Sequence, residues 1–533
     1  MHRRRFLKFA LAAGSSSALL ISCASKSNIK GSIIGASAAR GHMLRDKTFA
    51  DPVKILSKNV VIVGAGISGL SAARNLFKNG VQDFVILDLE DEPGGNSRYG
   101  SNSVSEYPWG AHYIPTPNND LPEYLDFLKE TNVVTSFNES GLPVYNEEYL
   151  CFDPQERLYI NGRWQDGLVP HYGLPEDDLK QVNSFIKMMD VFRDEKGSDG
   201  KFIFSIPVDE STKDITELDS VTMKTWMIEN SFTSDYLHWY INYCTRDDFG
   251  TSYDQVSAWI GIHYFASRRG IGANANHSDV LTWPEGNGFL VKQLTAGITD
   301  KMQLGNVALN VIFNDNGVLV KYYDSRKKVV NAIQCKQCIL ATPQFVTARL
   351  LADDDRMKKV HENYYYTPWM VANIAVSRLE ERSGAPLSWD NVIYGSSSLG
   401  YVEATHELLS QTSSRKNLTY YLPLTEGTVA DARKAAQERT HEQWVKIIID
   451  DLKKVHPNIE EAIQEVNVMI WGHAMAQPLP GMVHGSLRAE LSTSIKNKIH
   501  FAHSDLAGCS IFEEAFYQGL KASEKVLSSM GIG

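Results

Sequence analysis

The chain has 533 residues, of which 43% are hydrophobic, and its formal net charge is -10 at pH 7. Its length and apolar content suffice for a large core, and we expect two lobes rather than several independent units. The negative charge argues against binding to nucleic acid and is compatible with a cationic small-molecule substrate. The cysteines show no disulfide-scaffold spacing, and no second ligand pair accompanies the CxxC of Cys335 and Cys338, so we predict no metal site.

The chain begins with a targeting pattern. Arg3-Arg4-Arg5-Phe6-Leu7-Lys8 precedes an apolar stretch from Phe9 to Ile21, which is too short to span a bilayer because about 20 residues are needed. The first of these segments resembles the twin-arginine (Tat) export motif, and Leu20-Ile21-Ser22-Cys23 looks like a bacterial lipobox. We therefore expect residues 1–23 to be a signal read by the Tat export machinery. A lipid anchor on Cys23 would make the mature protein a periplasmic or cell-envelope lipoprotein.

A strand, turn and helix pattern follows at residues 59–69. The apolar run Val60 to Val63 predicts a buried strand and Ser68 to Lys78 a helix, with a GxGxxG pattern between them. Such glycines allow a tight turn and let backbone N-H groups at a helix N-terminus approach a dinucleotide diphosphate. A second strand, Phe84 to Leu87, ends in Asp88, 19 residues after the last glycine, where a carboxylate can bind a ribose diol. The residues predicted to cradle the dinucleotide are Gly64, Ala65, Gly66, Ser68, Gly69 and Asp88.

Five further motifs bear on which dinucleotide is bound. They are Glu92-Pro93-Gly94-Gly95-Asn96-Ser97-Arg98, Tyr107-Pro108-Trp109-Gly110-Ala111-His112-Tyr113, Ile339-Leu340-Ala341-Thr342-Pro343, Ile499-His500-Phe501-Ala502-His503-Ser504-Asp505, and the helix from Phe512 to Ala522. Together they resemble the flavin-containing amine oxidase superfamily, from about Lys58 to the C-terminus. The resemblance implies FAD as the cofactor.

The same resemblance assigns roles to several residues. It implies that Gly94 and Gly95 line the diphosphate, that Gly110 and Ala111 pass beside the isoalloxazine, and that Asp505 lies near the ribityl-pyrophosphate linkage.

The sequence departs from the family pattern at three places. An arginine usually follows the paired glycines, whereas this chain has Asn96, with Arg98 two places on, and either could meet the phosphate. The closing helix usually reads Glu-Gly-Ala, but here an extra carboxylate, Glu514, is expected near the flavin edge. A lysine that is water-bridged to flavin N5 in many amine oxidases is matched by Asn373. The last difference puts oxygen in doubt as the electron acceptor, and a quinone or a cytochrome is the alternative.

Candidates for the catalytic wall are His112, Tyr113 and His473, with tryptophans nearby. Oxidation of an amine requires the uncharged form with its α-carbon hydrogen against flavin N5, so walls that desolvate and orient the substrate supply much of the effect. Either histidine could accept the ammonium proton near neutral pH, and an ordinary structural role is an equally good interpretation of each. Asp247 and Asp248 also suggest an ammonium site, although a helix-capping turn is the favoured interpretation.

The overall prediction is an α/β, two-lobed flavoprotein. A Rossmann-like FAD-binding domain is expected to be discontinuous and to alternate with an α+β substrate domain. After the signal comes a flexible tether at 24–55, rich in Ser, Ala, Gly and Lys. The FAD-binding domain comprises 56–115, 281–349 and 466–533, and the substrate domain comprises 116–280 and 350–465.

Three functions remain open on the sequence. The first is an FAD-dependent oxidoreductase, oxidase or dehydrogenase, that transfers a hydride from a C-H bond of an amine or polyamine to flavin N5. The second is an FAD-dependent desaturase or oxidase of an isoprenoid or aromatic substrate, for which a purely apolar pocket is expected. The third is a non-catalytic protein that binds flavin for structural reasons.

Overall fold

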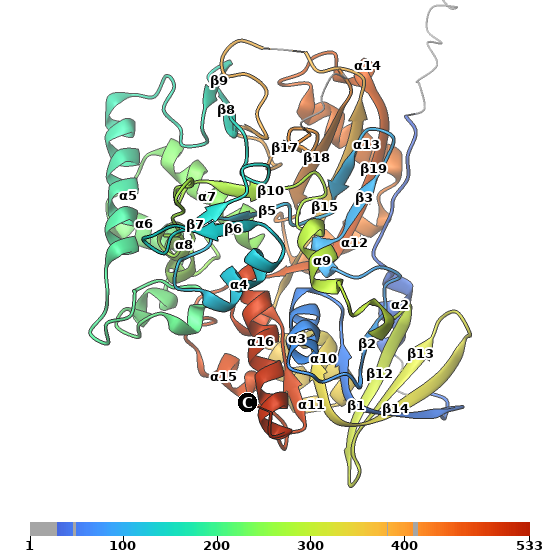
Figure 1. Ribbon diagram of the computed structural model, residues 1–533. Coiled ribbons are helices and arrows are strands. Elements are labelled where there is room, and N and C mark those ends of the chain that lie inside the picture. The colour runs from blue at the N-terminus through green and yellow to red at the C-terminus, as the bar shows by residue number, and fades with distance from the viewer. Residues whose placement is uncertain (1–28, 46–48, 381, 409–413, 533) are drawn as a thin grey trace, which may run out of the picture.

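The computed structural model describes residues 29–45, 49–380, 382–408 and 414–532. Two seven-stranded sheets organise these residues (Figure 1). The first sheet has the order β11-β2-β1-β14-β13-β12, with β20 beside β14. Its strands are β1 (Ile55–Val63), β2 (Phe84–Asp88), β11 (Met302–Leu304), β12 (Asn306–Asn314), β13 (Gly317–Asp324), β14 (Val329–Leu340) and β20 (Ile499–Phe501).

The central strands of this sheet are parallel and buried on both faces. Side chains of a strand alternate between faces, and β1 divides accordingly. Val60 and Ile62 pack with α3 (Ile67–Lys78) and α16 (Phe512–Ser529), whereas Val61 and Val63 face the layer that includes α10 (Gln344–Leu351) and α11 (Asp354–Asn363). The strand β1 therefore lies between two layers that contain helices.

The second sheet has the order β19-β15-β18-β17-β16-β8-β9 and lies in the upper part of Figure 1. Its strands are β8 (Glu156–Ile160), β9 (Arg163–Asp166), β15 (Tyr366–Val376), β16 (Asp390–Ile393), β17 (Tyr401–Glu403), β18 (Lys416–Pro423) and β19 (Ile463–Ala476). One face packs on α12 (Val429–Glu438), α13 (His441–Leu452) and α14 (Ile459–Ala462). The other face packs on α5 (Glu176–Asp194), α6 (Met223–Glu229), α7 (Asp235–Phe249) and α8 (Ala258–Ala266).

Shorter elements connect the two lobes. The helices are α2 (Ala38–His42), α4 (Pro122–Glu130), α9 (Gly288–Thr295) and α15 (Ser486–Ser492). The two-stranded pairs are β3 (Tyr99–Ser101) with β4 (Glu106–Pro108), β5 (Tyr113–Pro115) with β10 (Val280–Thr282), and β6 (Val134–Phe137) with β7 (Pro143–Tyr145). Short 3-10 helices are η1 (Met43–Arg45), η2 (Gly95–Ser97), η3 (Val208–Glu210), η4 (Thr216–Ser220), η5 (Thr299–Lys301) and η6 (Ser504–Leu506). No helix of the described segments has the length and apolar content that crossing a membrane requires.

The position of β19 differs from the expected domain boundary at residue 466. This strand pairs along its length with β15 and so belongs to the second sheet up to Ala476. The chain returns to the first sheet only at β20. Strand propensity marks an extended segment, but the partner that the strand chooses depends on contacts far along the chain.

The described part of the expected tether is folded. Lys30 and Ile33 form bridges with Glu465 and Val468 of β19, and Ile34 N donates to Val468 O at 2.6 Å. Because β19 is an edge strand, this pairing satisfies backbone groups that would otherwise lie open. We call residues 30–45 the strap. Figure 1 shows it descending beside the second sheet and ending with α2 near β2. The expectation of a flexible tether is wrong for these residues.

Candidate active site and cofactor cavity

The turn between β1 and α3 brings three glycines into the expected arrangement. A Cβ at Gly64, whose φ is +107°, would lie 2.3 Å from Ala341 O, and a Cβ at Gly69 would lie 1.9 Å from Gly64 O. A Cβ at Gly66 would meet nothing within 4 Å. Two glycines therefore permit close backbone packing, and the third opens the N-terminus of α3 to a cavity.

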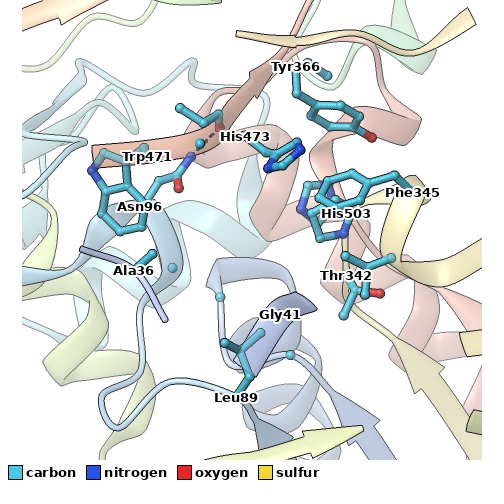
Figure 2. Close-up of a pocket in the computed structure, with 18 of the residues that line it drawn as sticks. Ala36, Gly41, Leu89, Asn96, Thr342, Phe345, Tyr366, Trp471, His473 and His503 are labelled. Atoms are coloured by element: carbon cyan, nitrogen blue, oxygen red, sulfur yellow. Dashed lines mark hydrogen bonds between the residues drawn. The ribbon is translucent and has the colours of Figure 1, made fainter. Parts of the chain in front are cut away.

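That cavity has a volume of about 1520 Å³ and runs between the two lobes. Figure 2 shows Asn96, Trp471 and His473 on one side of it and Leu89 and Gly41 on another. Eight of the predicted cofactor residues line it: Gly64, Gly66, Ser68, Asp88, Gly94, Gly95, Asn96 and Ala111. The other five do not contribute to the lining: Ala65, Gly69, Arg98, Gly110 and Asp505.

Asp88 lines the cavity and also fastens the glycine turn. Its Oδ2 accepts from Ala65 N at 2.6 Å and its Oδ1 from Glu90 N at 2.8 Å. Burial raises the pKa of Asp88 to about 6, although the two N-H groups oppose this shift. The carboxylate predicted to bind a ribose therefore also stabilises the glycine turn and the loop after β2.

Both polar residues after the paired glycines already have partners within the protein. Asn96 Nδ2 donates to Ala474 O at 2.6 Å. Arg98 lies 3.5 Å from both Glu90 and Glu92.

Gly110 and Ala111 pack against the same turn. A Cβ at Gly110 would lie 2.3 Å from Asn96 O, and Ala111 N donates to that oxygen at 2.9 Å. The segment expected beside the flavin is thus held on the segment expected beside the diphosphate.

Asp505 is fully buried behind the cavity wall. Its Oδ2 accepts from Gln344 N at 2.8 Å and from the Tyr366 hydroxyl at 2.7 Å, and its Oδ1 lies 3.0 Å from His503 Nδ1. Although burial opposes ionisation, His503, Tyr366 and the Gln344 N-H together lower the pKa of Asp505. The carboxylate orients His503, which does line the cavity.

The C-terminal helix α16 contributes its first turn to the cavity through Phe512 and Ala515. A Cβ at Gly519 would lie 2.2 Å from Ser68 O, so this glycine lets α16 approach α3 closely. Glu514 accepts a hydrogen bond from Val208 N and is absent from the cavity lining. The extra carboxylate thus fastens α16 to the substrate lobe, which differs from its expected place at the flavin edge.

An aromatic cluster surrounds His112. Its ring is stacked on Tyr421 at a centroid distance of 4.7 Å and lies 5.5 Å from Trp389 and 5.1 Å from Tyr113. Tyr421 donates to Gly110 O at 2.9 Å, which attaches the cluster to the segment expected beside the flavin. Burial lowers the pKa of His112 to about 4, so its ring is neutral at pH 7.

His473 lies in a different environment from His112. Its ring is stacked on Phe345 at 4.5 Å and lies 6.2 Å from Tyr366, and it faces the cavity (Figure 2). Burial and the nearby Arg433 and Arg349 lower the pKa of His473 to about 3. The ring contacts of the two histidines predicted as alternative proton acceptors therefore define separate clusters.

Three carboxylates gather beside the aromatic cluster. Glu156 and Asp390 are paired residues on the parallel strands β8 and β16. Asp247 lies four residues after Tyr243 on α7, and the Tyr243 hydroxyl donates to Asp390 Oδ2 at 3.4 Å. We call Glu156, Asp247 and Asp390 the carboxylate set.

Burial raises the pKa of all three members, and neighbouring carboxylates add to the shift: Asp166 for Glu156, Asp248 and Glu156 for Asp247, and Glu156 and Asp247 for Asp390. The pKa of Asp247 rises to about 7 through burial and the charges of Asp248 and Glu156, with Arg268 opposing. Burial raises the pKa of Glu156 to about 7 as well, and that of Asp390 well above its ordinary value. Among the described residues, no ion pair engages the set, and each member keeps partial exposure. Such groups are suited to binding a cation.

Sequence reasoning missed most of this arrangement. Asp248 does not cap a helix but forms an ion pair with Arg268 at 2.9 Å. The helix α7 ends at Gly250 in the left-handed conformation, so Asp247 lies in its last turn, where the helix dipole disfavours an anion. An acidic residue in the last turn before a helix-ending glycine was thus the sequence feature that could have indicated a functional role for Asp247. Nothing in the sequence placed Glu156, Asp390, Trp389 or Tyr421 nearby.

Comparison with known proteins decides the family. The model of the flavin containing amine oxidoreductase family matches residues 67–527. The chain belongs to this family. It is an FAD-dependent oxidoreductase, and FAD is its cofactor. The cavity fits that group, because an open N-terminus at Gly66 faces a space lined by the glycine turn and by the first turn of α16.

Curated relatives of this flavoenzyme resemble it over part of their length. An L-amino acid dehydrogenase of Synechocystis sp. is 25% identical over 305 residues, which cover 55% of this chain and 58% of that protein. Polyamine oxidase 7 of Oryza sativa subsp. japonica is 31% identical over 97 residues, 17% of this chain and 20% of that one. The matched segments thus span about one fifth to three fifths of these relatives.

Solved structures share the fold of this flavoenzyme over nearly all its length. A putrescine oxidase bound to putrescine superposes with a TM-score of 0.63 at 17% identity, covering 89% of this chain and 100% of that one. Cyclohexylamine oxidase from Brevibacterium oxydans gives 0.63 at 16% with the same coverage. A fatty acid isomerase from P. acnes gives 0.62 at 14%, covering 88% and 98%. The predicted α/β, two-lobed flavoprotein fold is confirmed.

Asn373, which stands where many amine oxidases have lysine, is 2% exposed in β15 of this flavoenzyme. Its Nδ2 donates to Pro108 O at 3.1 Å, and its Oδ1 accepts from the Thr419 hydroxyl at 2.8 Å. The amide joins the second sheet to β4 and is absent from the cavity lining. In this structure its side chain has a structural partner on each polar atom.

Proposed function

We propose that this flavoenzyme oxidises a diamine or polyamine and that the carboxylate set holds the ammonium group remote from the reacting carbon. The observation that carries the proposal is the set itself: three carboxylates that form no ion pair with any residue the structure describes, beside an aromatic wall attached to Gly110. A second ammonium on the substrate would relieve their mutual repulsion. A monoamine could not do so once its nitrogen lay at the reaction centre.

The residues divide the remaining work between them. Trp389, Tyr421 and His112 form a wall that excludes water and orients an alkyl chain. The neutral ring of His112, in the cluster attached to Gly110, can accept the proton of the ammonium group that reacts, while the carboxylate set holds the other ammonium group. When bound, FAD would accept the hydride that leaves the carbon next to the amine nitrogen.

Two other substrate classes fit the site less well. An amino acid carries a carboxylate, and the nearby cation Arg268 is already paired with Asp248. An isoprenoid or aromatic hydrocarbon calls for a purely apolar pocket, and the carboxylate set beside the aromatic wall does not favour such a substrate. The names of the relatives, polyamine oxidases and a putrescine oxidase, support the amine class, and the L-amino acid dehydrogenase keeps amino acids in the test.

Anaerobic mixing tests this function. Purified holoenzyme is mixed with a diamine, a polyamine, a monoamine of equal carbon number and an amino acid, and bleaching of the flavin absorbance is followed. We expect fast bleaching by the first two only. Preferential bleaching by the amino acid or the monoamine would reject the proposed substrate class, and no bleaching by any amine would leave the desaturase and the non-catalytic alternatives.

We propose a quinone or a cytochrome as the electron acceptor instead of oxygen. Support comes from Asn373, which has no basic nitrogen and is held by Pro108 and Thr419. Reduced enzyme is therefore expected to reoxidise slowly in air and quickly with a soluble quinone analogue or cytochrome. Rapid reoxidation by air alone would show an oxidase.

We also propose export by the Tat machinery and anchoring through a lipid on Cys23. The support is the sequence of residues 1–23, which lie outside the described part of the chain. Cell fractionation of Cys23→Ser provides the test. The variant is expected in the soluble envelope fraction, whereas unchanged membrane association would exclude this anchor.

A further inference from the structure

The strap forms one wall of the cofactor cavity. Nine of its residues line the same space as the glycine turn: Ile33, Gly35, Ala36, Ser37, Ala38, Gly41, His42, Leu44 and Arg45. Figure 2 labels two of them, Ala36 below Asn96 and Gly41 above Leu89. A segment ahead of the nucleotide-binding fold thus contributes more of the lining than the turn itself.

Both ends of the strap are fastened. At one end, Lys30 O accepts from Val466 N and Ser32 O accepts from Val468 N, both at 2.9 Å. At the other end, Ser37 donates to Glu90 from its N at 2.8 Å and from its hydroxyl at 3.1 Å. The strap therefore crosses from the edge of the second sheet to the loop after β2.

Arg40 makes the second contact with that loop. Its guanidinium donates to Leu89 O at 2.7 Å and to Asp91 Oδ2 at 2.9 Å. Because Asp88 immediately precedes Leu89 and fastens the glycine turn, the strap is attached directly beside the site expected for the cofactor ribose.

The basic end of the strap meets two arginines and a neutral histidine across the cavity. His42 and Arg45 face Arg349 of α10, Arg433 of α12 and His473 of β19, all of which line the cavity. Burial and these like charges lower the pKa values of His42, Arg349 and Arg433 as well as His473. Within the described ranges, none of the five forms an ion pair with a carboxylate. Such a group attracts an anion.

We propose that the strap is part of the FAD site, covering the bound cofactor, and that its basic end helps to hold the diphosphate. The chain has Asn96 where its family has arginine, and the cations of the strap, α10 and α12 provide positive charge from the other side. FAD then leaves only when the strap detaches from Glu90 and Leu89. This inference rests on FAD as the cofactor and not on the proposed amine substrate.

The rate of FAD release from the holoenzyme tests the strap. The double variant Ser37→Ala/Arg40→Ala removes its side-chain contacts with Glu90, Leu89 and Asp91, and fluorescence of released FAD after dilution gives the rate. We expect release at least 10-fold faster than in the wild type, which weakens binding by about 1.4 kcal/mol when the association rate is unchanged. Lys54→Ala, an exposed cation outside the cavity, is the matched control and should release FAD at the wild-type rate.

Two further variants keep the test decisive. A Cβ at Gly31 would lie 1.7 Å from Val466 O, so Gly31→Val should loosen the β19 end and also speed release. The pair Arg45→Ala/Arg349→Ala should make release less dependent on salt than in the wild type, because fewer charges meet the diphosphate. Wild-type release rates in both Ser37→Ala/Arg40→Ala and Gly31→Val would overturn the proposal. An unchanged salt dependence in Arg45→Ala/Arg349→Ala would show that these cations do not help to hold the diphosphate.

A separate group of side chains points to a metal. Donor atoms of Cys151, His406 and Glu407 all lie within 4.8 Å of one another. Cys151 and Glu407 are 6% and 7% exposed. Both carboxylate oxygens of Glu407 are buried and meet no described residue with regular hydrogen-bond geometry, although the Thr282 hydroxyl and the Cys151 thiol lie beside them. Buried carboxylates are normally paired, hydrogen-bonded or bound to a metal.

The donor set matches zinc. Thiolate, imidazole and carboxylate are its usual ligands, and the sulfur selects against magnesium and calcium. His406 Nε2 lies 2.9 Å from Phe152 O, and donation to that carbonyl would leave Nδ1 for a metal. We infer a Zn²⁺ site formed by Cys151, His406 and Glu407, with water completing four ligands. It would tie the segment before β8 to the loop after β17.

Elemental analysis of the purified holoenzyme tests this site. After dialysis against Zn²⁺ and then metal-free buffer, we expect one zinc per chain in the wild type and in Cys509→Ser, a buried free cysteine outside the group. Cys151→Ser and Glu407→Gln should hold markedly less. Cobalt substitution should give a sulfur-to-metal charge-transfer band that Cys151→Ser lacks. Absence of stoichiometric metal in the wild type, or equal zinc in Cys151→Ser, would refute the zinc site. The prediction from the sequence that the chain has no metal site would then stand.

Discussion

Glu156 and Asp390 are direct neighbours on the parallel strands β8 and β16, and each keeps partial exposure while its pKa is raised. Like charges directly opposite each other in a sheet destabilise it. The protein tolerates this pair together with Asp247 beside the aromatic wall. We interpret this cost as part of a binding site, where groups poorly suited to the empty protein are suited to a ligand.

Asp247→Asn is expected to weaken diamine binding. The amide keeps the shape but loses the charge that attracts a distal ammonium. KM for a diamine should rise about 10- to 100-fold, corresponding to about 1.4 to 2.7 kcal/mol, with a smaller change in kcat. Steady-state kinetics with a diamine and a matched monoamine give the comparison. Asp254→Asn, an exposed residue beyond α7, is the control and should leave KM unchanged; equal losses for the monoamine would argue against a distal-ammonium role.

The pH dependence of diamine oxidation should follow the carboxylate set. Because the pKa values of Asp247 and Glu156 are about 7, these groups are neutral below that pH and become anionic above it. The value of kcat/KM for a diamine should therefore rise as pH increases through about 7. In Asp247→Asn this rise should shrink. A flat profile of kcat/KM between pH 6 and about 8 in the wild type would show that ionisation of the carboxylate set does not control diamine binding.

The same shift has a consequence for stability. The pKa of Asp247 is near 4 in the unfolded chain and about 7 in the fold, so folding favours the protonated form. The stabilisation that comes from this preferential protonation of Asp247 is fully present below about pH 4 and is lost as pH rises through about 7. At pH 8, Asp247→Asn should increase the free energy of unfolding by about 1–3 kcal/mol, with a smaller gain near pH 5. Thermal or urea unfolding at both pH values measures it, and destabilisation at pH 8 would contradict the assigned repulsion.

His112→Phe should lower turnover while FAD stays bound. Phenylalanine can keep the stacking on Tyr421 but cannot accept a proton, and we expect kcat to fall about 100-fold. Flavin absorbance per protein should remain at the wild-type value. Full activity in this variant would exclude His112 as the proton acceptor and favour the carboxylate set, since a ring with a pKa of about 4 is a weak base at pH 7.

Two glycine variants separate folding from cofactor binding. Gly69→Ala brings a Cβ to 1.9 Å from Gly64 O and should destabilise the fold. A Cβ at Gly66 meets no protein atom within 4 Å, so Gly66→Ala should fold with near wild-type Tm but lose FAD affinity, because the methyl group enters the space of the diphosphate. Flavin content and Tm measured together check both. Full flavin content in Gly66→Ala would indicate that the diphosphate does not bind at this turn.

The local parts of the fold could be predicted from the sequence. The β1-α3-β2 unit depends on neighbouring residues, and its apolar periodicity and glycines are visible in a short stretch. The sheet that β19 joins was beyond this reasoning because its partner, β15, lies far along the chain. The strap misled for a similar reason: its composition is typical of a linker, but pairing with an edge strand depends on backbone groups that any sequence carries.

The candidate site shows the same limit. Residues that touch the cofactor turn follow recognisable motifs, and eight of them line the cavity. The carboxylate set comes from α7, β8 and β16, and only the folded chain brings these three elements together. The environments of His112 and His473 also depend on partners from other elements, such as Tyr421 and Phe345.

If Cys23 carries a lipid, as proposed above, the attachment of the strap to β19 would limit the distance between the enzyme and the membrane. In that case only six residues lie between Cys23 and Lys30, where pairing with β19 begins, and seven extended residue steps reach at most about 25 Å. The catalytic body would then lie close above the lipid headgroups, with the strap side nearest to them. A hydrophobic electron carrier dissolved in the bilayer would need to travel only a short distance to reach the flavin.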